Sequence, residues 1–471
     1  MAIDKSAIET LKTKLSPTSE IVPPDSEKYA DSIKRWSAAA EKPAGLVVYP
    51  TTAADVSQIV LFAKENNIEL ATVGGGHGTS GAASTDGGVC IDLSKMRKVT
   101  VDPEAKTITA QGGALWRDVD AEAEKYQMAT VGGTVNHTGI GGLTLGGGYG
   151  FLSPAYGLVI DNLLSVEMVL ADGTIVTASD TSHPDLFWAI KGAGIGFGVA
   201  TTFIYRAHSQ KSPVWGGLMI FPKPHLGAVI QMANTVVQES EPGPVMLMGF
   251  AALPPTCQPV ILALVWFNGS ADEAEKYYKS LLDLGPLVNT AKEIPYSESN
   301  TLANGPSAHG LRRTMKGSAF LAPLELSFAD TIWDEYIAFI EKVPDAQETL
   351  VMFEFVPFKK ILAVPQTATA FANRGAYGNI LLQPTWRDKV NDGVCREWTR
   401  AVSRMAREEL ERRVGEGTDE VTKSGEGEYG NYDSLGASGK TVFGVNFPRL
   451  VELKKRYDPQ NVFCKGPSLQ E

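Results

Sequence analysis

Three glycine-rich segments in the first 200 residues constrain the fold of this chain most. The first, residues 73–81 (VGGGHGTSG), follows an alternating apolar run that predicts a strand. Its glycines let the backbone approach another group closely and adopt positive φ angles at little cost. It also carries His77 on a thin loop. Such a loop can hold a phosphate-bearing or planar cofactor, or it can be a structural turn whose histidine hydrogen-bonds its neighbours.

The second segment, residues 132–150, contains nine glycines among nineteen residues. A flexible linker would carry serine and charge, whereas this segment interleaves Ile140, Leu143, Leu145 and Tyr149. We therefore expect a packed loop that contacts a flat group. The third segment, residues 192–198 (GAGIGFG), precedes a predicted strand.

Spacing excludes the common glycine motifs. A dinucleotide fingerprint needs GxGxxG between a strand and a helix, and Gly192-Ala-Gly194 fails because Phe197 stands at the sixth position. P-loop, GxSxG and HExxH motifs are also absent from the sequence. The three glycine loops could together line the pyrophosphate and ring system of an extended cofactor.

Periodicity divides the chain into two regions. The first begins β-α-β, with Thr52 and Asp55 capping the helix, and continues with strands, a helix at 115–126, a hairpin at 166–177 and a helix at 184–192. From about Ser209, extended stretches such as 260–267 and 350–355 alternate with helices at 271–284, 329–343 and 392–414. This pattern predicts an antiparallel sheet backed by helices, followed by a glycine-rich return near Gly425 and a last helix at 447–457.

Composition limits the partners and the compartment. A chain of 471 residues suggests two domains, and a net charge of −11 argues against nucleic acid or an anionic membrane. The four cysteines form no CxxC pair, so we expect no structural metal site and no disulfide framework, although one bridge remains open. The first residues carry charge throughout and no apolar run could span a bilayer, so we expect a cytoplasmic protein.

Four ordered motifs make the chain similar to a known family. They are VGGGHGTSG, the GIGGxxxGGGYG element at 139–150, HPDLFWAIKGAGIGFGV from His183, and the C-terminal YGNYD…FGVNFPRLVELKKRYDPQNVF. These motifs resemble the FAD-linked oxidases of the vanillyl-alcohol-oxidase superfamily, specifically the berberine-bridge-enzyme-like family, from about Val47 to Ser468. The resemblance implies an α+β fold: a two-subdomain FAD-binding module (1–208) completed by a C-terminal segment (425–471), with an inserted antiparallel-sheet substrate domain (209–424).

The resemblance also implies how FAD is held. His77 would be bonded through its ring to the flavin 8α-methyl group, its alternative being a non-covalent loop histidine. Many relatives add a cysteine link where this chain reads Val135-Asn136-His137, so we expect a single covalent bond. His137 could form a second link, but we expect it to support residues that contact the flavin or to pack in the core. The other positions that would contact FAD are Gly74, Gly75, Gly76, Gly78, Thr79, Ser80, Gly139, Gly141, Gly142, Thr144, Gly147, Gly148, Tyr149, Gly198, Val199 and Asn446.

The chemistry expected of the family is hydride transfer from a substrate C–H to the flavin, assisted by a base. Tyr432 matches a tyrosine that often serves as this base, with Ser434 replacing a family aspartate; it could instead only pack against the flavin. A tyrosine base needs a pKa lowered from about 10. Glu354 is the one carboxylate in an apolar strand and could be the base, a partner of Tyr432 or half of a rim salt bridge.

Other positions have lesser roles in the resemblance. Arg374 would be structural or near the pocket, Asn373 is given no chemistry, and Gly196 lacks a side chain that relatives use. Thr144 stands where relatives carry a residue that gates oxygen, which favours O₂ access. Several aromatic residues could line the cavity or belong to the core: Trp266, Phe353, Phe355, Tyr377 and Trp386.

The sequence thus predicts an FAD oxidase that acts on an alcohol, amine or activated C–H of a small organic metabolite. Oxygen would reoxidise the flavin and give hydrogen peroxide. Two alternatives remain open, a dehydrogenase that uses another acceptor and a flavin-bound protein with a non-redox or scaffold role. The substrate and the oligomeric state stay open.

Overall fold

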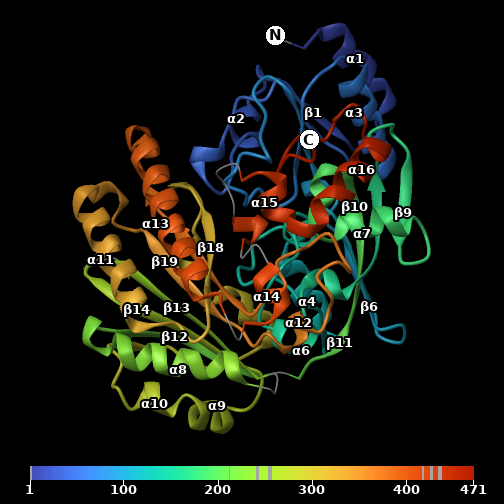
Figure 1. The fold of residues 1–471 in the computed structure, drawn as a ribbon. Helices are drawn as coiled ribbons and strands as arrows, with labels where there is room; N and C mark the ends of the chain where they lie inside the picture. Colours follow the sequence, from blue (N-terminus) through green and yellow to red (C-terminus); the bar gives the residue numbers. More distant parts are fainter. Residues whose placement is uncertain are drawn as a thin grey trace.

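Three large sheets organise the molecule (Figure 1), and two further sheets among the described residues have two strands each. The computed structural model describes residues 3–211, 213–239, 243–252, 257–415, 418–424, 428–432 and 437–470. Ser434 and the first three residues (425–427) of the expected glycine-rich return at 425–431 lie outside these ranges. In the described part of the chain, no helix is both long enough and apolar enough to cross a bilayer.

The first sheet has the order β1-β2-β4-β3 and is parallel except for its edge strand β1. Its strands are β1 (Glu20–Val22), β2 (Leu46–Tyr49), β4 (Val89–Asp92) and β3 (Leu70–Val73). Helix α3 (Ala53–Glu65) connects β2 to β3 and starts with the expected capping box, in which Thr52 and Asp55 exchange hydrogen bonds. The glycine loop therefore leaves the carboxyl end of β3, an edge strand that runs parallel to β4, and ligands bind beyond the carboxyl ends of such strands.

The second sheet is antiparallel, in the order β5-β6-β10-β8-β9. Its strands are β5 (Val99–Asp102), β6 (Thr107–Gln111), β10 (Val199–Arg206), β8 (Leu163–Val169) and β9 (Ile175–Ser179), with β8 and β9 forming the predicted hairpin. Helices α4 (Trp116–Glu124), α5 (Ile140–Leu145) and α7 (Pro184–Ala193) belong to the same region. The second glycine segment is therefore not all loop, because residues 140–145 form a short helix.

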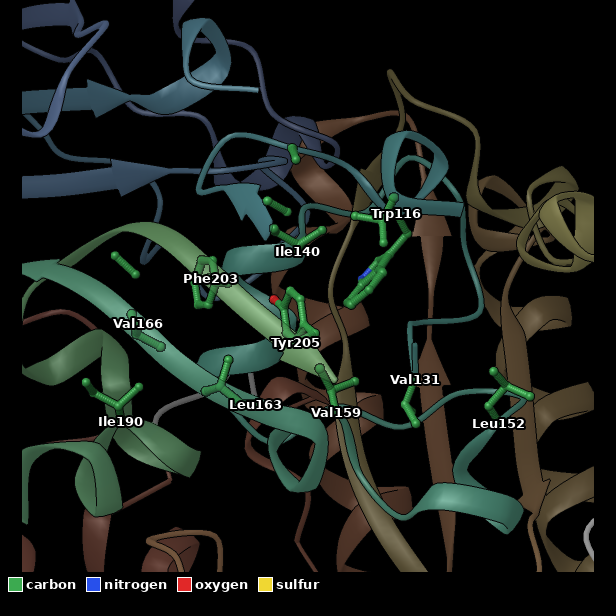
Figure 2. Packing of buried hydrophobic residues seen from close by; sticks show 14 of the residues in the cluster. Trp116, Val131, Ile140, Leu152, Val159, Leu163, Val166, Ile190, Phe203 and Tyr205 are labelled. Atoms are coloured by element: carbon green, nitrogen blue, oxygen red, sulfur yellow. The ribbon is translucent and has the colours of Figure 1, made fainter. Parts of the chain in front are cut away.

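Buried aromatic side chains join α4 and α5 to the second sheet (Figure 2). Trp116, Phe203, Tyr205 and Ile140 are fully buried in one cluster. A Cβ at Gly132 would lie 2.9 Å from the Trp116 ring, so only glycine lets the chain pass the indole here. The second glycine segment is packed against this core, as its apolar residues predicted.

The third sheet forms the predicted inserted domain, and its path is β15-β12-β14-β13-β19-β20-β18 with β16 beside β12. Helices α8 (Leu226–Gln238), α11 (Leu326–Lys342) and α13 (Asp392–Arg413) cover one face, and the other face is turned toward the rest of the molecule (Figure 1). The predicted helix at 271–284 is divided into α9 (Ala271–Tyr277) and α10 (Lys279–Leu282). The strands of the third sheet are β12 (Val214–Phe221), β13 (Pro244–Ala252), β14 (Pro259–Phe267), β15 (Val288–Asn289), β16 (Lys292–Ile294), β18 (Lys316–Leu321), β19 (Leu350–Phe355) and β20 (Tyr377–Gln383).

The C-terminal helices α15 (Gly439–Phe443) and α16 (Phe447–Tyr457) return to the N-terminal region (Figure 1). The buried Lys454 ammonium donates hydrogen bonds to the carbonyl of Gly196 and to the carboxylate of Asp458. These bonds tie α16 to the third glycine segment. The α+β fold predicted from the sequence is confirmed.

The Asp55 carboxylate gives the fold a defined pH dependence. Burial alone would raise its pKa, but hydrogen bonds from Ser16, Thr52 and Thr51 outweigh burial and lower the pKa from 3.8 to about 2. Since the folded state holds the ionised form, Asp55 stabilises the fold above about pH 4 and loses this effect as the pH falls toward 2. We expect Asp55→Asn to lower the free energy of unfolding by about 1–2 kcal/mol at pH 7 and by about half as much near pH 3.

Denaturant unfolding of both proteins at the two pH values measures this difference. Asp31→Asn, on an exposed surface position, is the matched control and should change stability little at either pH. An equal destabilisation by Asp55→Asn at both pH values would contradict the assignment.

Candidate active site

A cavity of 530 Å³ lies between the glycine loops and the open face of the third sheet. Its volume falls in the range of cofactor and small-molecule sites. One wall consists of residues 74–81, parts of 133–146 and the C-terminal residues 463–467. The opposite wall consists of sheet residues that share an inward direction: Leu247, Leu350, Met352, Glu354, Leu381 and Gln383.

The first two glycine loops contact each other directly at Gly75 and Gly139. A Cβ on Gly75 would lie 2.2 Å from the amide nitrogen of Gly139, and a Cβ on Gly139 would lie equally close to the amide of Gly75. Real Cβ atoms do not approach backbone this closely, so both positions require glycine. The contact brings together two loops whose touching glycines lie 64 residues apart in sequence.

The amides of the first loop are available to a ligand. Within the described residues, the backbone N–H groups of residues 75–81 have no acceptor in the protein. Successive free amides of this kind form an anion-binding concavity. Lys42 and Lys465 also line the cavity, and the Lys465 ammonium forms an ion pair with the Glu69 carboxylate. The segment suits the pyrophosphate of a dinucleotide.

His77 lies among aromatic and imidazole rings. Its ring stacks on Trp36 with centroids 4.8 Å apart and 13° between the planes. Its Nε2 atom lies 2.6 Å from Nδ1 of His137, and the ring of His309 meets it edge-on at 5.8 Å. Three of the six histidines of the chain therefore meet at one end of the cavity.

These imidazoles are neutral at pH 7. Burial first, and then the neighbouring basic groups, hold the pKa of His77 well below 6.5. The same effects lower the pKa of His137 to about 4 and lower that of His309. The Arg313 guanidinium, itself buried against Trp36, contributes to all three shifts. The donor atoms lie within 4.8 Å of one another, as metal ligands would, but the adjacent arginine opposes a divalent cation.

Tyr432 and Glu354 meet on the other wall of the cavity. The Tyr432 hydroxyl donates a hydrogen bond to Oε1 of Glu354 at 2.7 Å, and Nδ2 of Asn379 donates to Oε2 at 2.8 Å. Glu354 is the one carboxylate among the described residues that line the cavity. The contact between Tyr432 and Glu354 was one of the alternatives that the sequence left open.

Burial sets the protonation of this pair. It raises the pKa of Glu354 above 4.5, while the bonds from Tyr432 and Asn379 act in the opposite direction. Burial and the neighbouring Glu354 carboxylate raise the pKa of Tyr432 well above 10. Tyr432 is therefore a neutral phenol, and the carboxylate is the stronger proton acceptor of the two.

Most residues predicted to contact the cofactor line this cavity. They are Gly74, Gly75, Gly76, His77, Gly78, Thr79, Ser80, Gly139, Gly141, Gly142, Tyr149 and Gly198. The two predicted catalytic residues, Tyr432 and Glu354, line it as well.

Five predicted contact residues do not line the cavity. Thr144 is fully buried, and its hydroxyl hydrogen-bonds to the Ile140 carbonyl and the Tyr205 hydroxyl. The Asn446 amide donates to carbonyls of 366–370 and fixes that loop. Val199 is buried in β10. Gly147 and Gly148 have positive φ and pack against Phe371 and Val159.

The remaining candidates are structural. Arg374 is fully buried and forms a bidentate ion pair with Asp161. The aromatic residues that could have lined the cavity are buried elsewhere, because β19 alternates: Leu350, Met352 and Glu354 face the cavity, whereas Phe353 and Phe355 pack under the helices. Trp266, Tyr377 and Trp386 are core residues too.

Four residues of the site carry no signal in the sequence. Trp36 and His309 surround His77, Asn379 holds Glu354, and Gln383 presents a buried amide nitrogen without a partner among the described residues. They lie in segments without a local motif. The scarcity of histidine, six in the chain, was the one available hint for His309.

Comparison with known proteins agrees with this geometry. Residues 44–179 match the family model of an FAD binding domain, and residues 428–469 match the model described as berberine and berberine like. The chain is 34% identical over 454 residues to the FAD-linked oxidoreductase pgmH of Aspergillus terreus, covering 93% of this chain and 90% of that protein. It is 30% identical to the FAD-linked oxidoreductase srdI of Neurospora crassa, with 95% and 89% covered.

Solved structures share the fold. The 6-hydroxy-D-nicotine oxidase of Arthrobacter nicotinovorans superposes with a TM-score of 0.83 at 24% identity, covering 97% of this chain and 99% of that one. A xylooligosaccharide oxidase of Myceliophthora thermophila gives 0.81 at 20% identity, with 98% and 99% covered. Fold and site thus define an FAD-linked oxidoreductase. The chain belongs to the berberine-bridge-enzyme-like family of the vanillyl-alcohol-oxidase superfamily.

Alanine at two positions of the first glycine loop should distinguish glycines that the packing of the loops requires from glycines that only contact the cofactor. Gly75→Ala would force the loops apart, so we expect a loss of about 1–3 kcal/mol in stability together with lower FAD content. A Cβ on Gly78 meets no protein atom within 4 Å, so Gly78→Ala should leave the stability of the apoprotein unchanged. Apoprotein melting and the ratio of flavin to protein absorbance measure both effects. Equal stability of the two variants would contradict the loop contact.

Proposed function

We propose that this protein is an FAD-dependent oxidase. FAD is joined to His77 by a single covalent bond, and Glu354 with Tyr432 removes a proton from the substrate. The hydrogen bond between the Tyr432 hydroxyl and the buried Glu354 carboxylate carries the proposal. The Tyr432–Glu354 pair lies across the cavity from the free amides of the glycine loop and from the His77 imidazole. The site thus offers a proton acceptor opposite a cradle for an anionic, ring-bearing cofactor.

Residues of this chain would hold the cofactor in three ways. The amides of residues 75–81, with Lys42 and Lys465, would bind the pyrophosphate. The neutral imidazole of His77 would form the covalent bond. When bound, FAD supplies the ring that accepts a hydride from the substrate. Glu354, the one carboxylate among the described residues that line the cavity, then receives the proton that leaves in the same reaction.

The proton passes from the substrate through Tyr432 to Glu354. With a pKa well above 10, Tyr432 cannot store a negative charge, but its hydroxyl can accept one proton while it gives another to the carboxylate. Asn379 holds the second carboxylate oxygen and keeps Oε1 turned to Tyr432. The substrate is an alcohol, an amine or a molecule with an activated C–H bond, and the apolar inner face of the third sheet packs against its carbon skeleton.

The covalent bond is tested first because this test needs no substrate. We expect flavin to precipitate with the acid-denatured wild-type protein and to stay in the supernatant with His77→Ala. Protein-bound flavin fluorescence on a denaturing gel measures the difference. His225→Ala, which changes a histidine outside the cavity, is the control and should retain covalent flavin. Flavin released from wild type would disprove the bond while leaving an FAD protein.

Variants of the base test the proton path. Anaerobic bleaching of the flavin by a panel of alcohols and amines identifies a substrate, and peroxide formation under air shows whether oxygen is the acceptor. With that substrate, we expect Glu354→Gln to lower kcat by about 10²–10⁴-fold and Tyr432→Phe by about 10²-fold. Asp120→Asn, at a buried carboxylate that lines no described part of the cavity, is the matched control.

The pH profile should follow Glu354. Activity needs the carboxylate, so it should rise with pH along a limb that lies above 4.5, because burial raises the pKa of Glu354. Asn379→Leu removes a hydrogen bond that lowers this pKa, so it should move the limb to higher pH. A limb that stays in place in Asn379→Leu would assign it to another group.

A further inference from the structure

One contact of the site has no part in the oxidation, the 2.6 Å hydrogen bond between His77 and His137. We propose that His137 is a positioning residue for the covalent attachment of FAD. It accepts the Nε2 proton of His77 and so leaves Nδ1 of His77 as the nitrogen that reacts. This inference rests on the proposed covalent bond to His77 and adds the residue that directs it.

The choice of nitrogen follows from the geometry. Nε2 of His77 is occupied by Nδ1 of His137, so Nδ1 of His77 is the ring nitrogen left for a covalent bond. A nitrogen can attack only with a free lone pair, so the proton of the neutral ring must lie on Nε2. His77 is then the donor and His137 the acceptor. The stacked Trp36 ring fixes the plane of the His77 imidazole, and His137 fixes its rotation within that plane.

His137 is itself held firmly. The amide nitrogens of Trp116 and Arg117, at the start of α4, donate to the carbonyls of Thr138 and Asn136 on either side of it. Asn136 also exchanges two hydrogen bonds with Asn304 of the inserted domain. The loop is therefore anchored on both domains, and its histidine is placed before any ligand binds.

Charge around the pair keeps both rings in the reactive form. Arg313 and Arg117 lie close enough to lower the pKa of His137, after burial and His309. A protonated His137 would have no lone pair on Nδ1 and could not accept the bond. The neutral ring can do so at physiological pH, and it can share the positive charge that forms on His77 as its Nδ1 becomes alkylated.

The attachment balances with oxygen as the oxidant. One bond forms between Nδ1 of His77 and the 8α carbon of FAD, and one C–H bond of that methyl group breaks. The methyl hydrogen leaves as a proton, and the imidazole loses the proton on Nε2 through His137. The two electrons released reduce O₂, which takes up both protons to give hydrogen peroxide. In the product, FAD and His77 have each lost one hydrogen atom and are joined by the new bond.

Attachment kinetics in variants of His137 test the proposal. Apoprotein is mixed with FAD under air, and the covalent fraction is followed by intact mass and by acid precipitation, while native absorbance gives total bound FAD. We expect His137→Ala to bind FAD but to attach it roughly 100-fold more slowly. His137→Asn can present an amide oxygen at the position of Nδ1 and should recover part of the rate. Added imidazole should accelerate His137→Ala and leave wild type unchanged.

His225→Gln is the control, because His225 lies in a short helix at 223–225 and does not line the cavity. It should attach FAD at close to the wild-type rate. Attachment by His137→Ala at the wild-type rate, a rate in His137→Ala that imidazole does not change, or a peptide with flavin on His137 would each overturn the proposal. Absence of covalent flavin in wild type would instead overturn the bond to His77 itself.

Discussion

The site depends on the direct backbone contact between Gly75 and Gly139. Each residue occupies the space that a Cβ on the other would need. The contact joins the loop after β3 to the segment before α5, and these carry His77 and His137. Without it Nε2 of His77 and Nδ1 of His137 would not be held 2.6 Å apart, and the free amides of residues 75–81 would not form one wall of the cavity. The proposed chemistry of the site therefore depends on glycine at both positions.

The opposite wall depends on strand alternation. Because neighbouring side chains of β19 point to opposite faces, Glu354 shares the cavity face with Leu350 and Met352 while Phe353 and Phe355 enter the core under the helices. A shift of one residue in the register of β19 would bury two phenylalanines in the cavity and remove the carboxylate. The apolar neighbours of Glu354 in turn deprive it of water, which is the main cause of its raised pKa.

The sequence predicted those features of the fold and the site that short-range patterns determine. The capping box of α3, the hairpin of β8 and β9 and the two regions of the chain follow from local spacing. The first glycine loop drew attention to His77, the family resemblance to Tyr432, and the apolar strand around it to Glu354. The sequence could not predict contacts that need the tertiary fold. The aromatic residues of β19 and β20 were ambiguous until the face of each strand was known, and Thr144 turned to the core because Tyr205 offered a partner. Trp36 and His309 reach His77 from segments with no motif.

Burial acts in opposite senses at the two ends of one cavity. At the histidine end it lowers the pKa of imidazoles, and at the sheet end it raises the pKa of a carboxyl and a phenol. Both effects favour the uncharged form. Neutral imidazoles keep lone pairs for bonding, and a carboxylate that is poorly solvated accepts a proton more readily than an exposed one. The proposed attachment of FAD at one end and the proposed proton transfer at the other therefore both depend on the same exclusion of water.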